Sequence, residues 1–456
     1  MNREFDVIVI GAGPAGEVCA GRLGEHGLSV ALVEDRLVGG ECSFFACMPS
    51  KTLLRPAQAL DEARRVPGAA EAVTGGLDVP SALRRRDEVV HDLDDSSYLS
   101  WLDERGVTLV RGTGRLAGER AVTVGSETLT ARRAVVVATG SDPLLPPVEG
   151  LEAARPWTNR EATTAKEAPA RLVVLGGGVA SVELAQAWHS LGSAVSIIEG
   201  AHRLVSREEQ FVCELVQAAL VERGVDVCTN ARATRVRRDG SEVTVTLDDG
   251  REVTGDELLV AVGRKPRTGS IGLESIALEP GKAIEVGTDL RAGGFDWLYA
   301  VGDVNGRAPL THMGKYQARI AADAILGRGA AIDPLSDGPL SPRVIFTEPQ
   351  VAAVGHTLAS AEAAGIAARA VDFGTEDTAG GSFVGRNAPG ISRLVVDESR
   401  RVLVGATFCG VEVAEWVHAA TIAVVAEVPL EKLWHAVPCF PSRSEVWLRL
   451  LETYGL

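Results

Sequence analysis

The sequence predicts an α/β protein that contains two βαβ units and a separate α+β segment near its C-terminus. Three observations support this prediction. A strand, a glycine-rich turn and a helix occur together twice, the chain has 456 residues, and 50 of these are glycine, a number that suits many tight strand-to-helix turns. A chain of this length corresponds to about three domains.

The first βαβ unit begins at the N-terminus. An apolar strand at residues 6–10 leads into the glycine motif of Gly11, Gly13 and Gly16, and the next strand ends at Glu34. In this context the first glycine permits a tight turn, and the second lets the backbone approach a pyrophosphate at a helix N-terminus. A carboxylate at the end of the second strand accepts hydrogen bonds from a ribose hydroxyl. The sequence therefore predicts a dinucleotide site here.

The same pattern returns in the middle of the chain. An apolar strand at residues 172–175 leads into Gly176 and Gly178, and the following strand ends at Glu199. A single glycine motif is weak evidence, but two copies in the full strand–turn–helix–strand context predict two dinucleotide-binding domains.

Cys42 and Cys47 stand in a short run between glycines and a proline. In an unbroken α-helix their Cα atoms would lie ~8–9 Å apart, whereas a disulfide tolerates roughly 7 Å. Gly39, Gly40 and Pro49 favour a distorted helix start that brings them closer. A disulfide in such a strained turn is easily reduced, so we expect a redox centre. The alternative is two buried free cysteines that never meet.

Composition restricts location and partners. The seven cysteines form an odd, sparse set, unlike a secreted disulfide framework. No signal-peptide pattern opens the chain, and no apolar stretch approaches the ~18 residues of a membrane span. We therefore expect a soluble, cytoplasmic protein that neither binds nor crosses a membrane. The net charge of −15 makes nucleic acid an unsuitable partner.

Outside the two βαβ units the sequence predicts further helices and strands. Residues 52–105 favour helices, with interruptions near Pro67 and Pro80. Residues 134–140 form a buried strand that ends in a tight turn, and a proline-rich linker follows. Beyond residue 342, strands alternate with helical stretches at 412–427 and 443–453, as in an α+β domain.

Taken in order, these motifs resemble the flavoprotein disulfide reductase family, which includes dihydrolipoamide dehydrogenase, glutathione reductase and mercuric reductase. The resemblance covers the cysteine motif at 42–51, the strand end at 138–141 (ATGS), the second FAD signature at 299–303 (YAVGD) and the segment at 346–349 (FTEP). It implies two Rossmann-like domains, for FAD and NAD, and a C-terminal α+β dimerisation domain in a homodimer. The implied boundaries are 1–150 for the FAD-binding domain, completed by a central segment at 266–335, then 151–265 for the NAD(P)-binding domain and 340–456 for the dimerisation domain.

The resemblance also implies roles for individual residues. Cys47 would face the flavin, Cys42 would meet the final acceptor, and an ion pair of Lys51 with Glu183 would lie near flavin N5. The residues implied to bind FAD are Gly11, Gly13, Gly16, Glu34, Lys51, Gly114, Thr139, Gly140, Asp303 and Thr311. Those implied to bind the nicotinamide dinucleotide are Gly176, Gly178, Glu199 and Gly263. No resident metal site is expected.

Glu199 governs the choice between the two nicotinamide cofactors. A carboxylate at this position accepts the 2′-hydroxyl of NADH and repels the 2′-phosphate of NADPH. Arg203, four residues on, could soften that repulsion. We expect NADH, with NADPH as the weaker alternative.

The chain departs from the family at its C-terminus. Family members that act on small thiols carry a catalytic His from the partner subunit, and this sequence has Phe440 there, although Glu445 aligns with the family's Glu. Losing a general acid/base commonly costs ~10²–10⁴ in rate. We therefore expect a non-standard acceptor: an unusual disulfide, a quinone or a metal ion. The alternatives are a redox-sensing or carrier flavoprotein that acts on a protein partner, and a true dihydrolipoyl dehydrogenase that uses His435.

Neighbouring residues leave further alternatives open. Cys439 is either a third relay thiol or a buried inert cysteine, and Glu445 is either catalytic or a dimer-interface carboxylate. Phe44 and Phe45, between the two redox cysteines, either stack on a planar acceptor or fill the core. The sequence shows neither the C-terminal cysteine pair of mercuric reductase nor an N-terminal metal-binding module, so we do not expect mercury handling.

Overall fold

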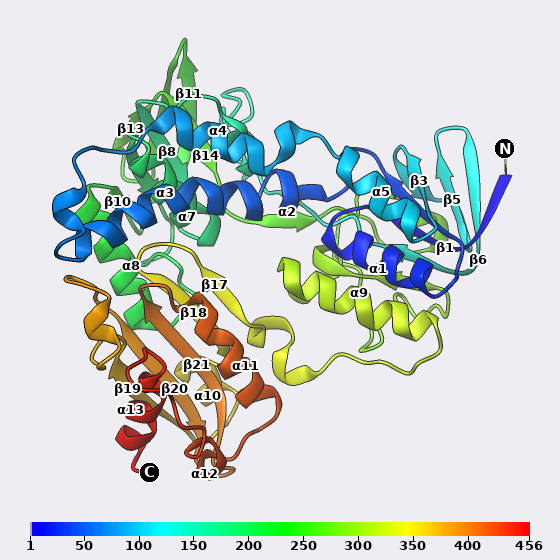
Figure 1. The fold of residues 1–456 in the computed structure, drawn as a ribbon. Coiled ribbons are helices and arrows are strands. Elements are labelled where there is room, and N and C mark those ends of the chain that lie inside the picture. The colour runs from blue at the N-terminus through cyan, green and yellow to red at the C-terminus, as the bar shows by residue number, and fades with distance from the viewer. Residues whose placement is uncertain (1) are drawn as a thin grey trace. The chain divides into compact units, whose positions relative to one another are not determined.

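The computed structural model describes residues 2–456, and their contacts divide the chain into two compact units (Figure 1). Each unit is assembled from three separate parts of the chain. The first unit contains the residues up to Pro49, Asp87–Leu144 and Arg264–Gly338, and the second contains Ser50–Arg86, Leu145–Gly263 and Pro339–Leu456.

A mainly parallel sheet forms the centre of the first unit. Its strands follow the order β3-β2-β1-β6-β5-β4, and β16 also pairs with β6. β1, β2, β3, β6 and β16 run parallel, whereas β4 and β5 are antiparallel additions. The strands are β1 (Asn2–Ile10), β2 (Val30–Glu34), β3 (Val107–Arg111), β4 (Gly114–Leu116), β5 (Ala121–Val124), β6 (Glu127–Val137) and β16 (Leu298–Ala300).

Helices cover this sheet because its central strands are apolar on both faces, as in parallel sheets generally. α1 and α9 pack side by side against one face, where Val7 and Val9 meet Ala20, Leu23 and Ala318 (Figure 1). A separate short ladder pairs β7 (Ser141–Pro143) with β15 (Arg264–Pro266). The helices are α1 (Pro14–Glu25), α2 (Gly40–Phe44), α5 (Ser96–Glu104), α9 (Thr311–Ile325) and the short η2 (His91–Leu93), η3 (Leu273–Ile276), η4 (Gly302–Asn305) and η5 (Pro334–Ser336).

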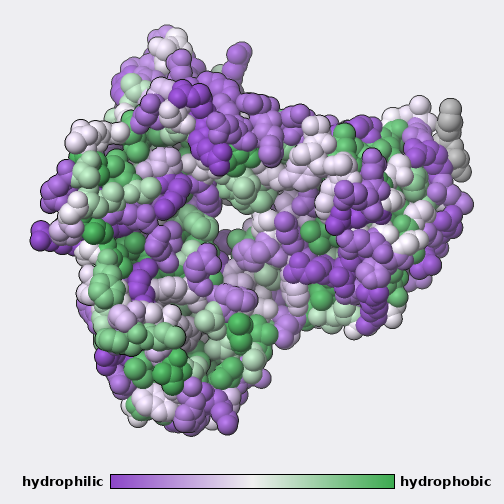
Figure 2. Space-filling model, viewed as in Figure 1, coloured by the Kyte–Doolittle hydropathy of each residue, from purple (hydrophilic) through white to green (hydrophobic). Residues whose placement is uncertain are grey.

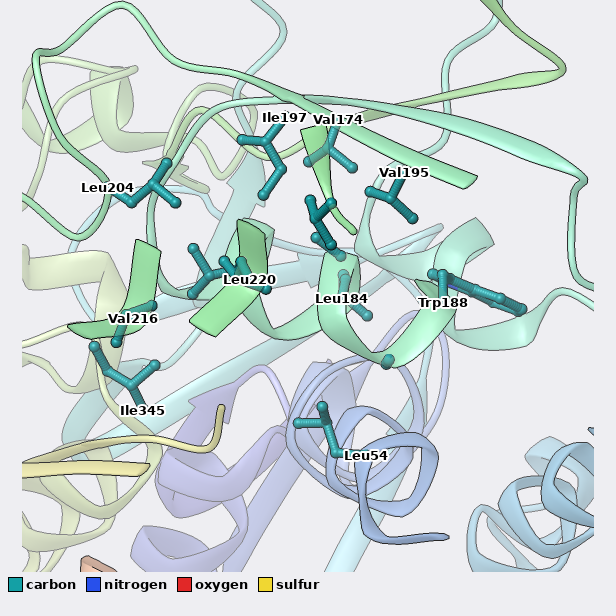
Figure 3. Packing of buried hydrophobic residues seen from close by; sticks show 14 of the residues in the cluster. Leu54, Val174, Leu184, Trp188, Val195, Ile197, Leu204, Val216, Leu220 and Ile345 are labelled. Carbon is teal, nitrogen blue, oxygen red and sulfur yellow. The ribbon is translucent and has the colours of Figure 1, made fainter. Parts of the chain in front are cut away.

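The second unit contains the other parallel sheet, in the order β10-β9-β8-β14. Figure 3 shows its core: Val174 and Ile197 of the sheet face Leu184 and Trp188 of α7, and Leu54 of α3 packs into the same cluster. The elements are α3 (Cys47–Arg65), which begins in the first unit, β8 (Arg171–Leu175), α7 (Val179–Ser190), β9 (Ala194–Ile198), α8 (Gln210–Arg223), β10 (Asp226–Cys228) and β14 (Glu257–Val260).

Two antiparallel sheets complete the second unit. The smaller follows the order β11-β12-β13, and the larger follows the order β17-β18-β21-β20-β19. α11 and α13 pack on the larger sheet around Phe408. The strands are β11 (Ala233–Asp239), β12 (Glu242–Leu247), β13 (Glu252–Gly255), β17 (Arg343–Ile345), β18 (Gln350–Gly355), β19 (Ala368–Gly374), β20 (Ile391–Asp397) and β21 (Val402–Gly410). The helices are η1 (Ala70–Ala72), α4 (Val79–Val89, which ends in the first unit), α6 (Asn159–Thr164), η6 (Gly338–Leu340, which begins there), α10 (Leu358–Ala363), η7 (Gly381–Phe383), η8 (Val413–Trp416), α11 (Val417–Val425), α12 (Leu430–Leu433) and α13 (Glu445–Tyr454).

The structure confirms the predicted α/β class with a C-terminal α+β segment, and corrects two local expectations. Pro80 lies in the first turn of α4 rather than interrupting a helix, a position that tolerates proline because its missing N–H would have no helical partner. The helical stretch predicted at 412–427 begins at Val413 as the short helix η8 and becomes the α-helix α11 only at Val417, because Glu412 has a left-handed backbone (φ 50°) that lies outside the helix. No helix in residues 2–456 has the length and apolar character that a bilayer crossing requires.

Candidate active site

The glycine motif of the first unit forms an open helix N-terminus. Gly11 has φ +100°, and a Cβ there would lie 2.5 Å from the Ala138 carbonyl oxygen; a Cβ on Gly16 would lie 1.8 Å from that of Gly11. Both positions therefore require glycine. Gly13 is the N-cap of α1, without a side-chain cap, and a Cβ there would meet no protein atom within 4 Å. This open space at the free N–H groups suits a pyrophosphate.

Glu34 is fixed beside this turn by two backbone amides. The Ala12 N–H donates to Oε2 at 2.7 Å, and the Arg36 N–H donates to Oε1 at 2.8 Å. Burial raises the pKa of Glu34, while these two amides oppose the rise. A carboxylate held at the end of β2 in this way still has lone pairs for ribose hydroxyls.

The second unit repeats this geometry. Gly176 has φ +107°, and a Cβ there would lie 2.6 Å from the Ala261 carbonyl oxygen. Gly178 is the N-cap of α7, and a Cβ there would meet no protein atom within 4 Å. Glu199 accepts hydrogen bonds from the backbone N–H of Gly177 and, at 2.6 Å, from that of Ala201. The two units therefore present matching open helix N-termini, each beside a carboxylate fixed by backbone amides.

Two arginines near Glu199 differ in their surroundings. The Arg203 guanidinium donates to the Ser206 carbonyl at 3.4 Å. The Arg232 side chain lies against Gly200, where a Cβ would be 3.3 Å from its Cγ. Arg232 is therefore a second cation beside Glu199. Sequence spacing did not select it, because 33 residues separate the two positions.

The chain breaks the helix between Cys42 and Cys47. Cys42 lies in α2, the backbone leaves the helical region at Phe45 (φ −134°, ψ 0°), and α3 begins at Cys47. Both cysteines carry thiols in this structure, and the Cys42 thiol is hydrogen-bonded to Cys47. The Cys47 Sγ also lies 3.3 Å from the Thr311 hydroxyl oxygen. The structure thus brings together Cys42, Cys47 and Thr311, as a redox pair requires.

The groups next to Cys42 change the pKa of its thiol. The hydrogen bond to Cys47 and burial raise the pKa of the Cys42 thiol strongly, whereas Thr311 and the charge of Lys315 oppose the rise. Between the two cysteines, Phe44 is buried and its ring centroid lies 6.3 Å from that of Tyr98. Phe44 therefore fills the core, while Phe45 is half-buried.

The second FAD signature is connected to the β7–β15 ladder. The Ser141 hydroxyl donates to Asp303 Oδ2 at 2.6 Å, and Arg264 donates to the Ser141 hydroxyl at 2.7 Å and to its carbonyl at 2.6 Å. Glu41 lies 3.8 Å from the same guanidinium. No role was predicted from the sequence for Arg264 or Ser141. Their positions could have pointed to them, because Arg264 directly follows Gly263 and Ser141 ends the ATGS segment.

Three further residues implied in FAD binding lie at strand ends of the first unit. Gly114 starts β4, and a Cβ there would lie 2.9 Å from the Ile10 side chain. The Thr139 hydroxyl donates to the Arg267 carbonyl at 2.8 Å, and the Gly140 carbonyl accepts from the Arg267 N–H at 3.0 Å. These contacts fix the backbone that follows β6.

Lys51 and Glu183 form an ion pair in the second unit. Lys51 Nζ donates to Glu183 Oε2 at 2.6 Å and lies 4.9 Å from the centre of the Phe346 ring. The Phe346 N–H donates to Glu183 Oε1 at 2.8 Å. Glu183 is buried, so it is not a solvated surface charge. Along α3, Lys51 stands one helical turn after Cys47.

The C-terminal segment exposes apolar groups where the resembling family has its His. Phe440 is 79% exposed and Val437 is 80% exposed. Cys439 and His435 are also exposed, so Cys439 is not a buried inert cysteine within this chain. Glu445 is buried and accepts from the Ala379 N–H at 3.2 Å and from Arg449 at 2.6 Å. Both partners lie within the second unit.

Comparisons with known proteins agree with these features. The family described as pyridine nucleotide-disulphide oxidoreductase matches residues 5–318, and its dimerisation domain matches residues 341–450. The chain is 30% identical to mercuric reductase from Lysinibacillus sphaericus over 447 residues, covering 97% of this chain and 81% of the relative. It is 31% identical to dihydrolipoyl dehydrogenase from Bacillus subtilis over 463 residues, covering 98% and 96%.

Two solved structures are similar along nearly the whole chain. The Cu(II) complex of the HOCl-induced flavoprotein disulfide reductase RclA from Escherichia coli has a TM-score of 0.87 and 25% identity, covering 99% of each chain. LpdA from Mycobacterium tuberculosis has the same TM-score and identity and covers 100% of each chain.

Proposed function

Because this chain belongs to the pyridine nucleotide-disulphide oxidoreductase family, we propose that it is an FAD-dependent NADH oxidoreductase with a non-standard electron acceptor. Family members are flavoproteins that use a pyridine nucleotide. In the proposal, electrons leave the flavin through Cys42 and Cys47 and do not pass to dihydrolipoamide or to a glutathione-type disulfide.

The observation that carries the acceptor proposal is Phe440. It aligns with the family's proton-transferring His, and a phenyl ring neither donates nor accepts a proton. The buried Glu445 binds Ala379 and Arg449 instead of orienting a His. A disulfide acceptor leaves as a thiolate that such a His would protonate. An acceptor that is not a disulfide does not depend on this proton transfer.

The first unit fits FAD. The open N-terminus of α1 at Gly13 would hold the pyrophosphate, Glu34 would bind a ribose, and Asp303 would bind the ribityl or pyrophosphate region. When bound, the flavin would accept a hydride from the nicotinamide and transfer an electron pair to the disulfide. Thr311 would fix the Cys47 sulfur for that transfer through their 3.3 Å contact.

We expect the second unit to prefer NADH to NADPH. The two amides that hold Glu199 keep a negative charge where the 2′-phosphate of NADPH would lie. We expect kcat/KM for NADH to exceed that for NADPH by about tenfold or more. Lys51, paired with the buried Glu183, would keep a positive charge near the redox helix.

Among non-standard acceptors, the exposed apolar groups favour a quinone. Val437 and Phe440 would offer a planar apolar molecule contact without a proton donor. A copper ion is the second candidate, because the similar RclA structure is a Cu(II) complex. The dimerisation domain supports a homodimer, and a cytoplasmic location, expected from the sparse cysteines, remains part of the proposal.

Steady-state NADH oxidation against four acceptors tests this function: lipoamide, oxidised glutathione, a soluble naphthoquinone and a Cu(II) salt. We expect the quinone or Cu(II) rate to exceed the lipoamide rate by at least about tenfold. The matched variant is Cys42→Ser, which should lose acceptor turnover while NADH still bleaches the flavin.

Two results would contradict the proposal. Rapid lipoamide turnover would indicate a true dihydrolipoyl dehydrogenase, with His435→Ala then showing whether that residue substitutes. Quinone turnover that survives Cys42→Ser would show that electrons bypass the dithiol. If no acceptor exceeds the oxygen background, the redox-sensing or carrier alternative replaces the enzyme proposal.

A further inference from the structure

A charged pair lies beside the dithiol on the first unit's own helices. Lys315 follows Thr311 by one turn on α9, so both residues share a helix face. Thr311 contacts Cys47 at 3.3 Å, and the charge of Lys315 acts on Cys42. On the adjoining α1, Glu17 Oε1 lies 3.9 Å from Lys315 Nζ.

Glu17 is unusual for a charged residue in the first turn of a helix. Its side chain is largely buried, and its Oε2 atom has no hydrogen-bond partner within residues 2–456. Burial raises the pKa of Glu17, and Lys315 opposes that rise. A buried carboxyl oxygen without a partner is costly, so its retention beside a redox dithiol points to a function.

We propose that Lys315, held by Glu17, supplies from the same chain the positive charge that stabilises the thiolate of Cys42, in place of the histidine that Phe440 replaces. This inference rests on the proposed role of Cys42 and Cys47 as the redox pair. Lys315 acts on the sulfur through space and is a positioning charge, not a proton donor.

Lys315 is a cation whose charge lowers the pKa of the Cys42 thiol. Within α2, the charge of Glu41 faces Arg264 at 3.8 Å, so these two charges offset each other. His312 stands next to Thr311 in the first turn of α9 and is exposed, and the exposed Arg319 lies one turn beyond Lys315. The titratable or charged groups on the neighbouring elements are therefore Glu41 of α2 with its partner Arg264, Cys47, Glu17 of α1, and His312, Lys315 and Arg319 of α9.

Coulomb's law predicts how each substitution changes the pKa of the Cys42 thiol. Removing the Lys315 charge disfavours the Cys42 thiolate, so the apparent thiol pKa rises. Glu17 pairs with Lys315 at 3.9 Å, so replacing its carboxylate should free the Lys315 charge and lower the thiol pKa. Retaining a cation, as in Lys315→Arg, should restore the original value.

The pH dependence of Cys42 alkylation tests this inference. The FAD-loaded protein is reduced with dithiothreitol, freed of reductant without oxygen, and treated with iodoacetamide across about pH 6 to 10, the range in which cysteine thiols titrate. Peptide mass spectrometry then gives the rate at Cys42. Lys315→Met should lower the thiolate fraction near neutral pH by about three- to tenfold, Lys315→Arg should restore it, and Glu17→Gln should increase it.

Arg319→Met is the matched control, because it removes a cation one turn further along the same helix. A shift for Lys315→Met no larger than that for Arg319→Met overturns the inference, as does a Glu17→Gln shift that is absent or opposite. Flavin absorbance and thermal melting confirm that each variant is folded. The proposed function fails separately if dithiothreitol exposes no additional thiols, because the protein would then lack a reducible Cys42–Cys47 disulfide.

Discussion

At the scale of single residues, the proposed acceptor depends on Phe440, which stands where the resemblance predicts a histidine. Restoring the missing acid/base by Phe440→His should raise lipoamide-dependent NADH turnover, by about 10²-fold. We expect the lower end of the usual range, because Glu445 is already engaged by Ala379 and Arg449 and would orient the new imidazole poorly.

The control for this substitution is Phe383→His. Phe383 is another exposed phenylalanine of the second unit, 67% accessible, outside the segment that aligns with the family's motif. It should leave lipoamide turnover unchanged. An equal gain in both variants, or no gain in Phe440→His despite bound flavin, would show that the absent histidine does not limit this chemistry.

At the scale of elements, the βα turn of the first unit requires glycine for two different reasons: close backbone packing at Gly16 and space for a ligand at Gly13. A Cβ on Gly16 collides with the Gly11 carbonyl, whereas a Cβ on Gly13 meets no protein atom and intrudes only on a ligand. We expect Gly16→Ala to destabilise the fold and Gly13→Ala to fold normally but bind FAD at least about tenfold more weakly, since a pyrophosphate needs close backbone approach.

Circular dichroism melting and the flavin content of the purified protein measure these two effects. Gly75→Ala is the control, because Gly75 is exposed and a Cβ there also meets no atom; it should change neither. If Gly13→Ala retains full flavin with wild-type affinity, the pyrophosphate does not lie at the N-terminus of α1.

At the scale of the whole molecule, the apolar surface of the C-terminal sheet region predicts self-association. α11 is apolar on most of its positions, Ile422 is 55% exposed, and Figure 2 shows hydrophobic surface over this helix. Monomers seldom leave such patches uncovered. Since the matching family domain is a dimerisation domain, we expect sedimentation to give about twice the 47.9 kDa chain mass.

Ile422→Glu should shift that equilibrium toward the monomer, because a carboxylate would be buried without a partner at the interface. Val221→Glu is the control: Val221 is 53% exposed on α8, a helix of the second unit, and its substitution should leave the dimer intact. A monomeric wild-type protein, or equal dissociation in both variants, would place the interface elsewhere.

Much of the fold could be read from the sequence because its signals are local. The apolar runs that end at Gly11 and Gly176 predicted parallel strands and tight turns, and both exist. The sequence did not predict that each unit is assembled from three separate segments. That assembly depends on contacts between residues far apart in the chain, such as the pairing of β7 with β15.

The sequence by itself determined the family of the protein and its main local features: two glycine turns after apolar strands, a cysteine pair at an interrupted helix start, and a phenylalanine where the resemblance predicts a histidine. Those features depend on residue type and short spacing. Only the tertiary structure decided which groups act on the cysteines. Thr311, Lys315 and Glu17 come from two helices almost 300 residues apart in sequence, and α1 and α9 approach because both cover the same face of one parallel sheet.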